Sequence, residues 1–113
     1  MGEIAYLAPS NPQWLGLEID TLCALRRVLG NESPFGWCDF VTRTEADGPC
    51  AEFCDHFGPV VRLRRVGRRY EVACLRTGAA NRTADLRRAA VLIRARWSGR
   101  MRTLPERPID RAG

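Results

Sequence analysis

The alternation of hydrophobic and polar positions is clearest between residues 60 and 76, where two segments flank Gly67-Arg68. In each segment every second side chain is mostly apolar, which is typical of a strand with one buried face. Glycine suits the first central position of a two-residue type II′ turn, because that position has a positive φ. The pattern therefore predicts a β-hairpin with strands at about 60–66 and 69–76. Its inward-facing pairs are Val61 with Cys74, Leu63 with Val72 and Arg65 with Tyr70, and Arg64 faces Glu71 on the other side.

Two longer segments repeat apolar residues at the helical period of 3.6. The first predicts a helix at about 12–29, with Asn11 and Pro12 at its start and Gly30 after its end. The second predicts a helix at about 83–97, closed by Gly99. Their apolar positions are Leu15, Ile19, Leu22, Leu25 and Leu29 in the first, and Leu86, Ala89, Ala90, Ile93 and Trp97 in the second.

The remaining segments give shorter signals. Residues 36–43 are aromatic and β-branched enough for a strand, and Glu3–Ala8 could form a short edge strand. Cys50, Phe53, Cys54 and Phe57 are spaced at i, i+3, i+4 and i+7, which predicts a short helix near 50–57.

Together these elements predict an α+β fold. We expect a three-stranded, mainly antiparallel sheet packed by the N-terminal and C-terminal helices. We expect one domain over residues 1–99, followed by an extended or flexible basic tail at 100–113 that carries two prolines and no periodicity.

Composition narrows the class of protein. The 113 residues are 45% hydrophobic and 27% charged, which is ordinary for a globular chain. No apolar run is long enough to cross a membrane, and no basic segment followed by an apolar one marks a secretory signal. We therefore expect a cytoplasmic protein with no membrane partner. The five cysteines, an odd number, fit reduced thiols better than a disulfide framework.

Charge is divided unevenly along the chain. All 18 basic residues are arginine; residues 1–58 hold three of them against nine carboxylates, a balance of −6. Residues 59–113 hold fifteen arginines against four carboxylates, a balance of +11, and the two balances sum to the net charge of +5. Such asymmetry indicates either an anionic partner for the basic half or mutual attraction of the two halves.

The arginines of the basic half give the main functional hypothesis. They could form one electropositive surface that neutralises phosphates of RNA or DNA, alone or in a nucleoprotein complex. The expected contact residues are Arg62, Arg64, Arg68, Arg69, Arg87, Arg88, Arg94, Arg96, Arg100 and Arg102.

The alternative is a protein-binding accessory, inhibitor or subunit of a larger complex. Val91 and Leu92 point away from the apolar stripe of the C-terminal helix, so they could contact a partner instead of the core. Arginine is also enriched at protein interfaces.

Cysteine and histidine chemistry is the weakest hypothesis. Cys38, Cys50, Cys54 and His56 have the ligand types of a zinc site but not the paired Cys-x2-Cys spacing. Cys54 and His56 could also be a nucleophile and its base, oriented by Asp55 or Asp39. No catalytic or cofactor motif accompanies them. The sequence therefore favours a non-enzymatic binding module that has no cofactor.

Overall fold

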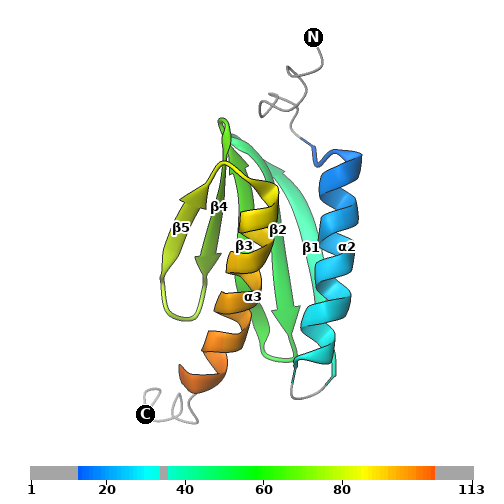
Figure 1. Cartoon of the computed structure of the whole chain (residues 1–113), viewed down its shortest axis with the longest axis vertical. Helices are drawn as coiled ribbons and strands as arrows, with labels where there is room; N and C mark the ends of the chain where they lie inside the picture. The colour runs from blue at the N-terminus through cyan, green and yellow to red at the C-terminus, as the bar shows by residue number, and fades with distance from the viewer. Residues whose placement is uncertain (1–12, 34–35, 104–113) are drawn as a thin grey trace.

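The computed structural model describes residues 13–33 and 36–103, with side chains described as far as Gly99. Two helices lie on the same face of one antiparallel sheet (Figure 1). The predicted strand at Glu3–Ala8 and most of the predicted tail lie outside the described residues. The elements in chain order are α2 (Gly16–Asn31), β1 (Asp39–Glu45), β2 (Gly48–Asp55), β3 (Gly58–Val66), β4 (Arg69–Cys74), β5 (Ala80–Thr83) and α3 (Leu86–Thr103).

The sheet has five strands in the order β1-β2-β3-β4-β5, and each is antiparallel to the next. The α+β class agrees with the sequence analysis, but the prediction of three strands is wrong. The segment predicted as a helix near 50–57 is strand β2, and β5 lies between the predicted strand at 69–76 and the predicted helix at 83–97, where no strand was expected. The first predicted strand, at 36–43, runs over 39–45 as β1.

The hairpin of β3 and β4 is the part of the fold that the pattern predicted best. Every predicted pair is present, from Val61 with Cys74 to Arg64 with Glu71. Gly67 has a φ of 62°, and none of the described residues other than glycine has a positive φ, which fits glycine in the first position of a type II′ turn.

Glycine also closes the hairpin of β1 and β2. Gly48 has a φ of 140°, and a Cβ placed on it would lie 2.1 Å from the carbonyl oxygen of Arg65. The backbone of β3 therefore approaches so closely that only a residue without a side chain fits here.

Both helices are shifted from their predicted bounds. α3 continues through Gly99 to Thr103, so the prediction that Gly99 follows the helix end is wrong, and residues 100–103 are helical. α2 starts at Gly16, where the side chain of Glu18 accepts the backbone N–H of Leu15 at 2.8 Å. No helix among the described residues is long and apolar enough to span a membrane.

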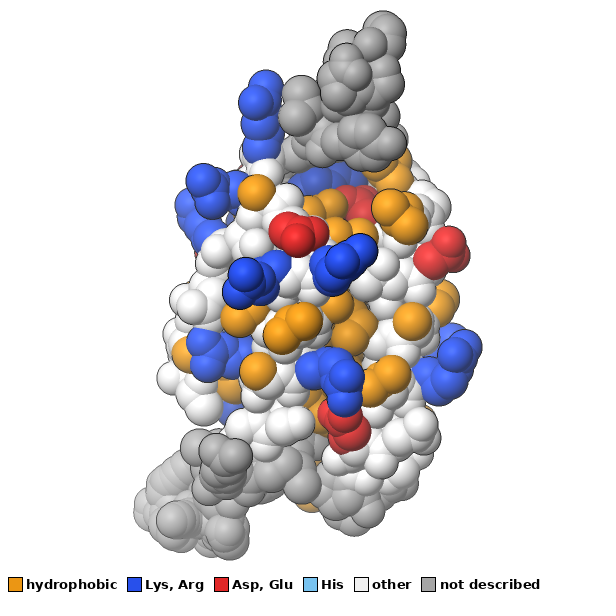
Figure 2. Space-filling view, viewed as in Figure 1, with side chains coloured by type: hydrophobic (Ala, Val, Ile, Leu, Met, Phe, Trp, Pro, Cys, Tyr) orange, Lys and Arg blue, Asp and Glu red, His pale blue; other side chains and the backbone are white. Residues whose placement is uncertain are grey.

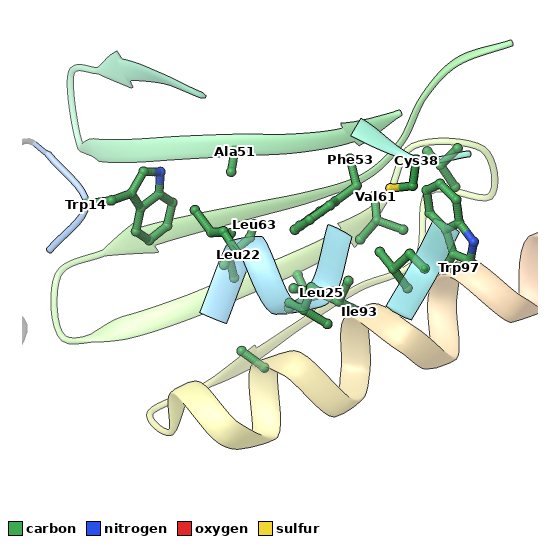
Figure 3. Packing of buried hydrophobic residues seen from close by; sticks show 14 residues of the cluster. Trp14, Leu22, Leu25, Cys38, Ala51, Phe53, Val61, Leu63, Ile93 and Trp97 are labelled. Carbon is green, nitrogen blue, oxygen red and sulfur yellow. The ribbon is translucent and has the colours of Figure 1, made fainter. Parts of the chain in front are cut away.

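The core lies between the helices and the sheet (Figure 3). Trp97 and Phe53 are its largest fully buried side chains, and the predicted stripes of both helices supply much of the rest. A register shift opposite Phe53 and Cys54 lets the consecutive residues Val60 and Val61 both be completely buried.

Candidate functional site

The sheet face turned away from the helices, here called the open face, carries most of the strand arginines. Strand alternation places Arg62, Arg64 and Arg69 on it as predicted. The same face also carries carboxylates from β1, β2 and β4, and three of the charged partners around it pair with Arg64. Its charged residues are Asp39, Arg43, Glu45, Glu52, Arg62, Arg64, Arg69, Glu71 and Arg82, with Asp47 in the adjoining turn.

Arg64 is the centre of this network. Its Nη1 donates to Glu71 at 3.2 Å, its Nη2 donates to Asp47, and its Nε lies 3.8 Å from Glu45. Because three carboxylates surround it, the positive charge of the Arg64 guanidinium is balanced, and its attraction for a phosphate is weak.

Arg43 extends the network across β1 and β2. Its Nη2 donates to Glu52 and its Nε to Glu45, each at 3.0 Å. The hydrogen bond to Glu52, followed by the one to Glu45, raises the pKa of Arg43 above its ordinary value.

Arg62 differs from its neighbours on the open face. Its Nε is shielded from solvent and has no hydrogen-bond partner among the described residues. It lies directly across from Glu52 and Ala73 in the register.

The other candidate arginines do not join this face. Arg68 is in the β3–β4 turn, and Arg87, Arg94 and Arg96 are on α3 in the opposite layer. Arg94 donates to Glu32 at 2.5 Å, and Arg96 donates to Asn81. On the helix side, basic side chains are scattered, with hydrophobic ones between them (Figure 2). The side chains of Arg100 and Arg102 lie outside the described residues.

Exposed aromatic side chains gather where β1 begins and β2 ends. Trp37 is 42% exposed and Phe57 is 68% exposed. The ring of His56 lies 5.1 Å from that of Trp37, and His56 precedes Phe57 in the β2–β3 turn. We call Trp37, His56 and Phe57 the aromatic end. A shallow hollow of about 330 Å³ adjoins it and is lined by Trp37, Arg26 and Arg27 among others.

The sequence matches no protein-family model, and no curated protein or solved structure is significantly similar to it. Functional inference for this chain therefore depends on the arrangement of its own residues.

The cysteines and His56 do not form one centre. No group of three His, Cys, Asp or Glu side chains in the described part of the chain could hold a metal ion. Burial raises the pKa of Cys50 and of Cys54, and nearby carboxylates raise the Cys54 value further. A raised pKa disfavours the thiolate that a nucleophile requires. Asp55 accepts from Arg76, and Asp39 from Arg26.

Of the two residues predicted at a protein interface, Val91 is exposed and Leu92 is partly buried. Val91 is 58% exposed on α3. Leu92 is partly buried and packs against the core, because its side of α3 faces the hollow beside β5.

A buried ionic cluster was not recognised from the sequence. Arg65 is 2% exposed, and its Nε and Nη2 donate to both carboxylate oxygens of Glu18 at 2.9 and 3.0 Å. The hydroxyl of Tyr70 donates to Glu18 at 2.6 Å. The only indication of this ionic cluster in the sequence is that Arg65 stands among apolar residues on the inward face of the predicted hairpin.

Proposed function

We propose that this chain is a protein-binding module that docks a segment of another polypeptide at the aromatic end. The observation that carries the proposal is the gathering of Trp37, His56 and Phe57 in exposed positions. Each large aromatic side chain can remove roughly 150–250 Å² of surface from water. Tryptophan and other aromatic residues are also enriched among the residues that dominate binding energy at protein interfaces.

The neighbouring charges favour an acidic segment with an apolar or aromatic anchor. Arg26 and Arg27 line the hollow beside Trp37. Arg27 makes no ion pair with another described residue, whereas Arg26 makes an exposed contact to Asp39 at 3.4 Å and lies 5.4 Å from the ring centre of Phe40. A carboxylate entering the hollow would meet Arg27, which has no ion pair to a described residue, and Arg26, whose ion pair to Asp39 is exposed and therefore weak.

The test uses labelled peptides in which acidic residues flank a phenylalanine or leucine, with amide-substituted versions as charge controls. Trp14 and Trp97 are buried, so acrylamide quenching of fluorescence reports chiefly on Trp37. We expect bound peptides to shield Trp37, and Trp37→Ala or Phe57→Ala to weaken binding at least about tenfold. Val91→Ala removes an exposed apolar side chain elsewhere and should bind as the wild type does. Wild-type protein that binds none of these peptides would refute the proposal.

A second candidate function is nucleic-acid binding at the other end of the sheet. Arg68 in the β3–β4 turn and Arg69 at the start of β4 lie at the same end as Arg87 and Arg88 at the start of α3 (Figure 1). None of the four makes an ion pair with another described residue, unlike Arg64. This basic end supports a smaller phosphate-binding surface than the whole set of arginines would give.

Labelled RNA and DNA titrated at two salt concentrations test this second candidate. Phosphate binding should be strong at low salt and fall steeply as salt rises. We expect Arg68→Gln with Arg87→Gln to reduce binding, and Arg64→Gln on the open face to leave it unchanged. Absence of binding at low salt would exclude the basic end as a nucleic-acid site.

A further inference from the structure

Strand β1 is one of the two outer strands of the described sheet, and among the described residues it pairs only with β2. The two-residue turn between Glu45 and Gly48 makes these two a hydrogen-bonded pair, and such pairs recur at every second residue. The backbone groups of Arg43 and Val41 therefore face β2, while those of Phe40, Thr42 and Thr44 face outward. In agreement, the N–H of Phe40 donates to the carboxylate of the neighbouring Asp39 at 2.8 Å.

Apolar side chains flank this edge on both sides. Val41 is 53% exposed on the open face of β1. On the helix side, Ile19 is 44% exposed and lies seven residues before Arg26, hence on the same face of α2. Arg26 reaches β1 at Asp39, so this face of α2 is turned toward the edge. A strand added to β1 would cover both apolar side chains.

We infer that β1 pairs antiparallel with β1 of a second copy of this chain, about a two-fold axis at Val41. In that register Val41 faces its own counterpart, and Asp39 of each copy faces Arg43 of the other. Phe40 of each copy and Thr42 of the other form the hydrogen-bonded pairs, each exchanging both backbone bonds, so the outward groups of these two residues are satisfied. The two sheets become one continuous sheet across the axis.

Charge disfavours the two registers whose axes lie further along β1. An axis at Thr42 would set Asp39 against Glu45 of the second copy, and an axis at Arg43 would set two arginines against each other; both are destabilising. The axis at Val41 instead gives two opposite-charge pairs. Within one copy Arg43 uses Nε and Nη2 for Glu45 and Glu52, so Nη1 is available for Asp39 of the other copy. Asp39 gives up its bond to its own Phe40 N–H, which then donates across the interface.

The dimer does not depend on the proposed protein-binding function. Trp37 would lie at the rim of the dimer, and Phe57 lies in the β2–β3 turn, away from the edge. Substitutions at Val41 or Asp39 should therefore lower the molecular mass of the protein in solution without abolishing peptide binding. Phe57→Ala should weaken peptide binding without changing that mass.

Sedimentation velocity gives the first test. Protein at roughly 100 μM should sediment as a dimer if the dissociation constant is about 10 μM or tighter. Thr42→Pro removes an N–H that faces away from β2, so the monomer fold is kept while a bond across the axis is lost. We expect this variant to dimerise at least about tenfold more weakly than Thr42→Val, its matched control. Wild-type protein that remains monomeric at this concentration would overturn the inference.

A charge exchange tests the register. Asp39→Arg alone sets two arginines against each other, and Arg43→Asp alone sets two carboxylates against each other, so each variant should be mainly monomeric. Mixing the two variants restores an opposite-charge pair on both sides of the axis, and we expect a heterodimer with the wild-type mass. A mixture that stays monomeric, although each variant has the wild-type circular dichroism spectrum, would rule out this pairing.

Cross-linking locates the axis. Facing residues in a non-hydrogen-bonded antiparallel pair have Cβ atoms about 4.5–5.5 Å apart, close to the roughly 3.5–4.5 Å of a disulfide. Val41→Cys should therefore form a covalent dimer with oxidised glutathione. Thr42→Cys and the wild type, whose five native cysteines are common to all, should not. A cross-link at Thr42 instead would place the axis elsewhere and refute the register.

Discussion

Arg65 faces the helix-covered side of the sheet, where its neighbours along β3, Val61 and Leu63, are apolar. The charge is tolerated there because the Nε and Nη2 of Arg65 both have hydrogen-bond acceptors. Besides its two bonds to Glu18, Nη2 donates to the carbonyl of Gln13 at 2.8 Å, and the guanidinium lies 5.8 Å from the ring centre of Trp14. The cluster fixes the start of α2 to β3 and β4.

We predict that Glu18→Gln lowers stability strongly at neutral pH and changes its pH dependence. Burial raises the pKa of Glu18, but hydrogen bonds from Arg65, the Leu15 N–H and Tyr70 outweigh burial and hold the pKa below its ordinary value of 4.5. A lowered native pKa means that the stabilisation is present above the ordinary value and is lost as pH falls through the native pKa. Removing one partner of a buried pair costs about 3–5 kcal/mol.

Urea unfolding between neutral pH and about pH 3 measures this effect. The wild type should lose stability across the acid range, and Glu18→Gln should lose less of it there. The double variant Glu18→Leu with Arg65→Met removes both charges, so its cost should be smaller than the sum of the two single costs. Additive costs would show that the two side chains are not coupled.

At position 48 the geometry of the backbone requires glycine. Any Cβ there would overlap the carbonyl of Arg65, and the φ of 140° is strained for other residues. We predict that Gly48→Ala destabilises the protein by at least about 2 kcal/mol in urea unfolding. Gly16→Ala is the control, because a Cβ at Gly16 meets nothing within 4 Å; it should be neutral or slightly stabilising. Equal effects of the two substitutions would contradict the close approach of β2 and β3.

At the scale of elements, local pattern predicted the hairpin of β3 and β4 but not β2. The hairpin has alternation and a turn glycine in the same stretch, so two local signals agree. In β2, the spacing of Cys50, Phe53 and Cys54 fits a helix, yet Ala51 and Phe53 face the core while Cys50 and Cys54 face the other way. Pairing on both sides with β1 and β3 decided the outcome, and a local periodicity contains no information about those distant partners.

The end of α3 was mispredicted for a related reason. Glycine after an apolar stripe usually marks a helix end, but Gly99 has helical neighbours on both sides. The exposed aromatic end was likewise not predicted, because aromatic residues in a strand or turn are usually assigned to the core. Exposure depends on which residues the two helices cover, and that is settled only by the assembled fold.

The substitution Gly99→Ala tests whether Gly99 lies inside α3 or just after the end of the helix. Inside a helix, alanine is more favourable than glycine by roughly 0.5–1 kcal/mol, whereas at a left-handed helix end it is unfavourable. Nothing lies within 4 Å of a Cβ at Gly99, so we expect a higher midpoint of thermal unfolding. Gly67→Ala, at a φ of 62°, should lower the midpoint. A decrease for Gly99→Ala would mean that the helix ends there.

At the scale of the whole molecule, the acidic and basic parts of the sequence pair with each other across the fold. Mutual attraction was one of two explanations for the uneven charge, and it applies to four of the fifteen arginines after residue 58. Pairs that join an arginine after residue 58 to a carboxylate before it are Arg64 with Glu45 and Asp47, Arg65 with Glu18, Arg76 with Asp55 and Arg94 with Glu32.

The ion pairs of the open face either contribute to the free energy of unfolding or make no net contribution to it, and Arg64 distinguishes the two cases. Arg64 holds Glu45, Asp47 and Glu71 together, and its side chain is 21% exposed. Exposed ion pairs contribute about 0.2–1 kcal/mol each, so we expect Arg64→Ala to lower the unfolding free energy by roughly 1–2 kcal/mol at low salt. The loss should shrink at about 1 M salt, where the screening length is near 3 Å. Arg69 lies on the same face but makes no ion pair with another described residue, so Arg69→Ala is the matched control. Urea unfolding at both salt concentrations measures the difference, and an equal loss for the two variants would mean that the network does not stabilise the sheet.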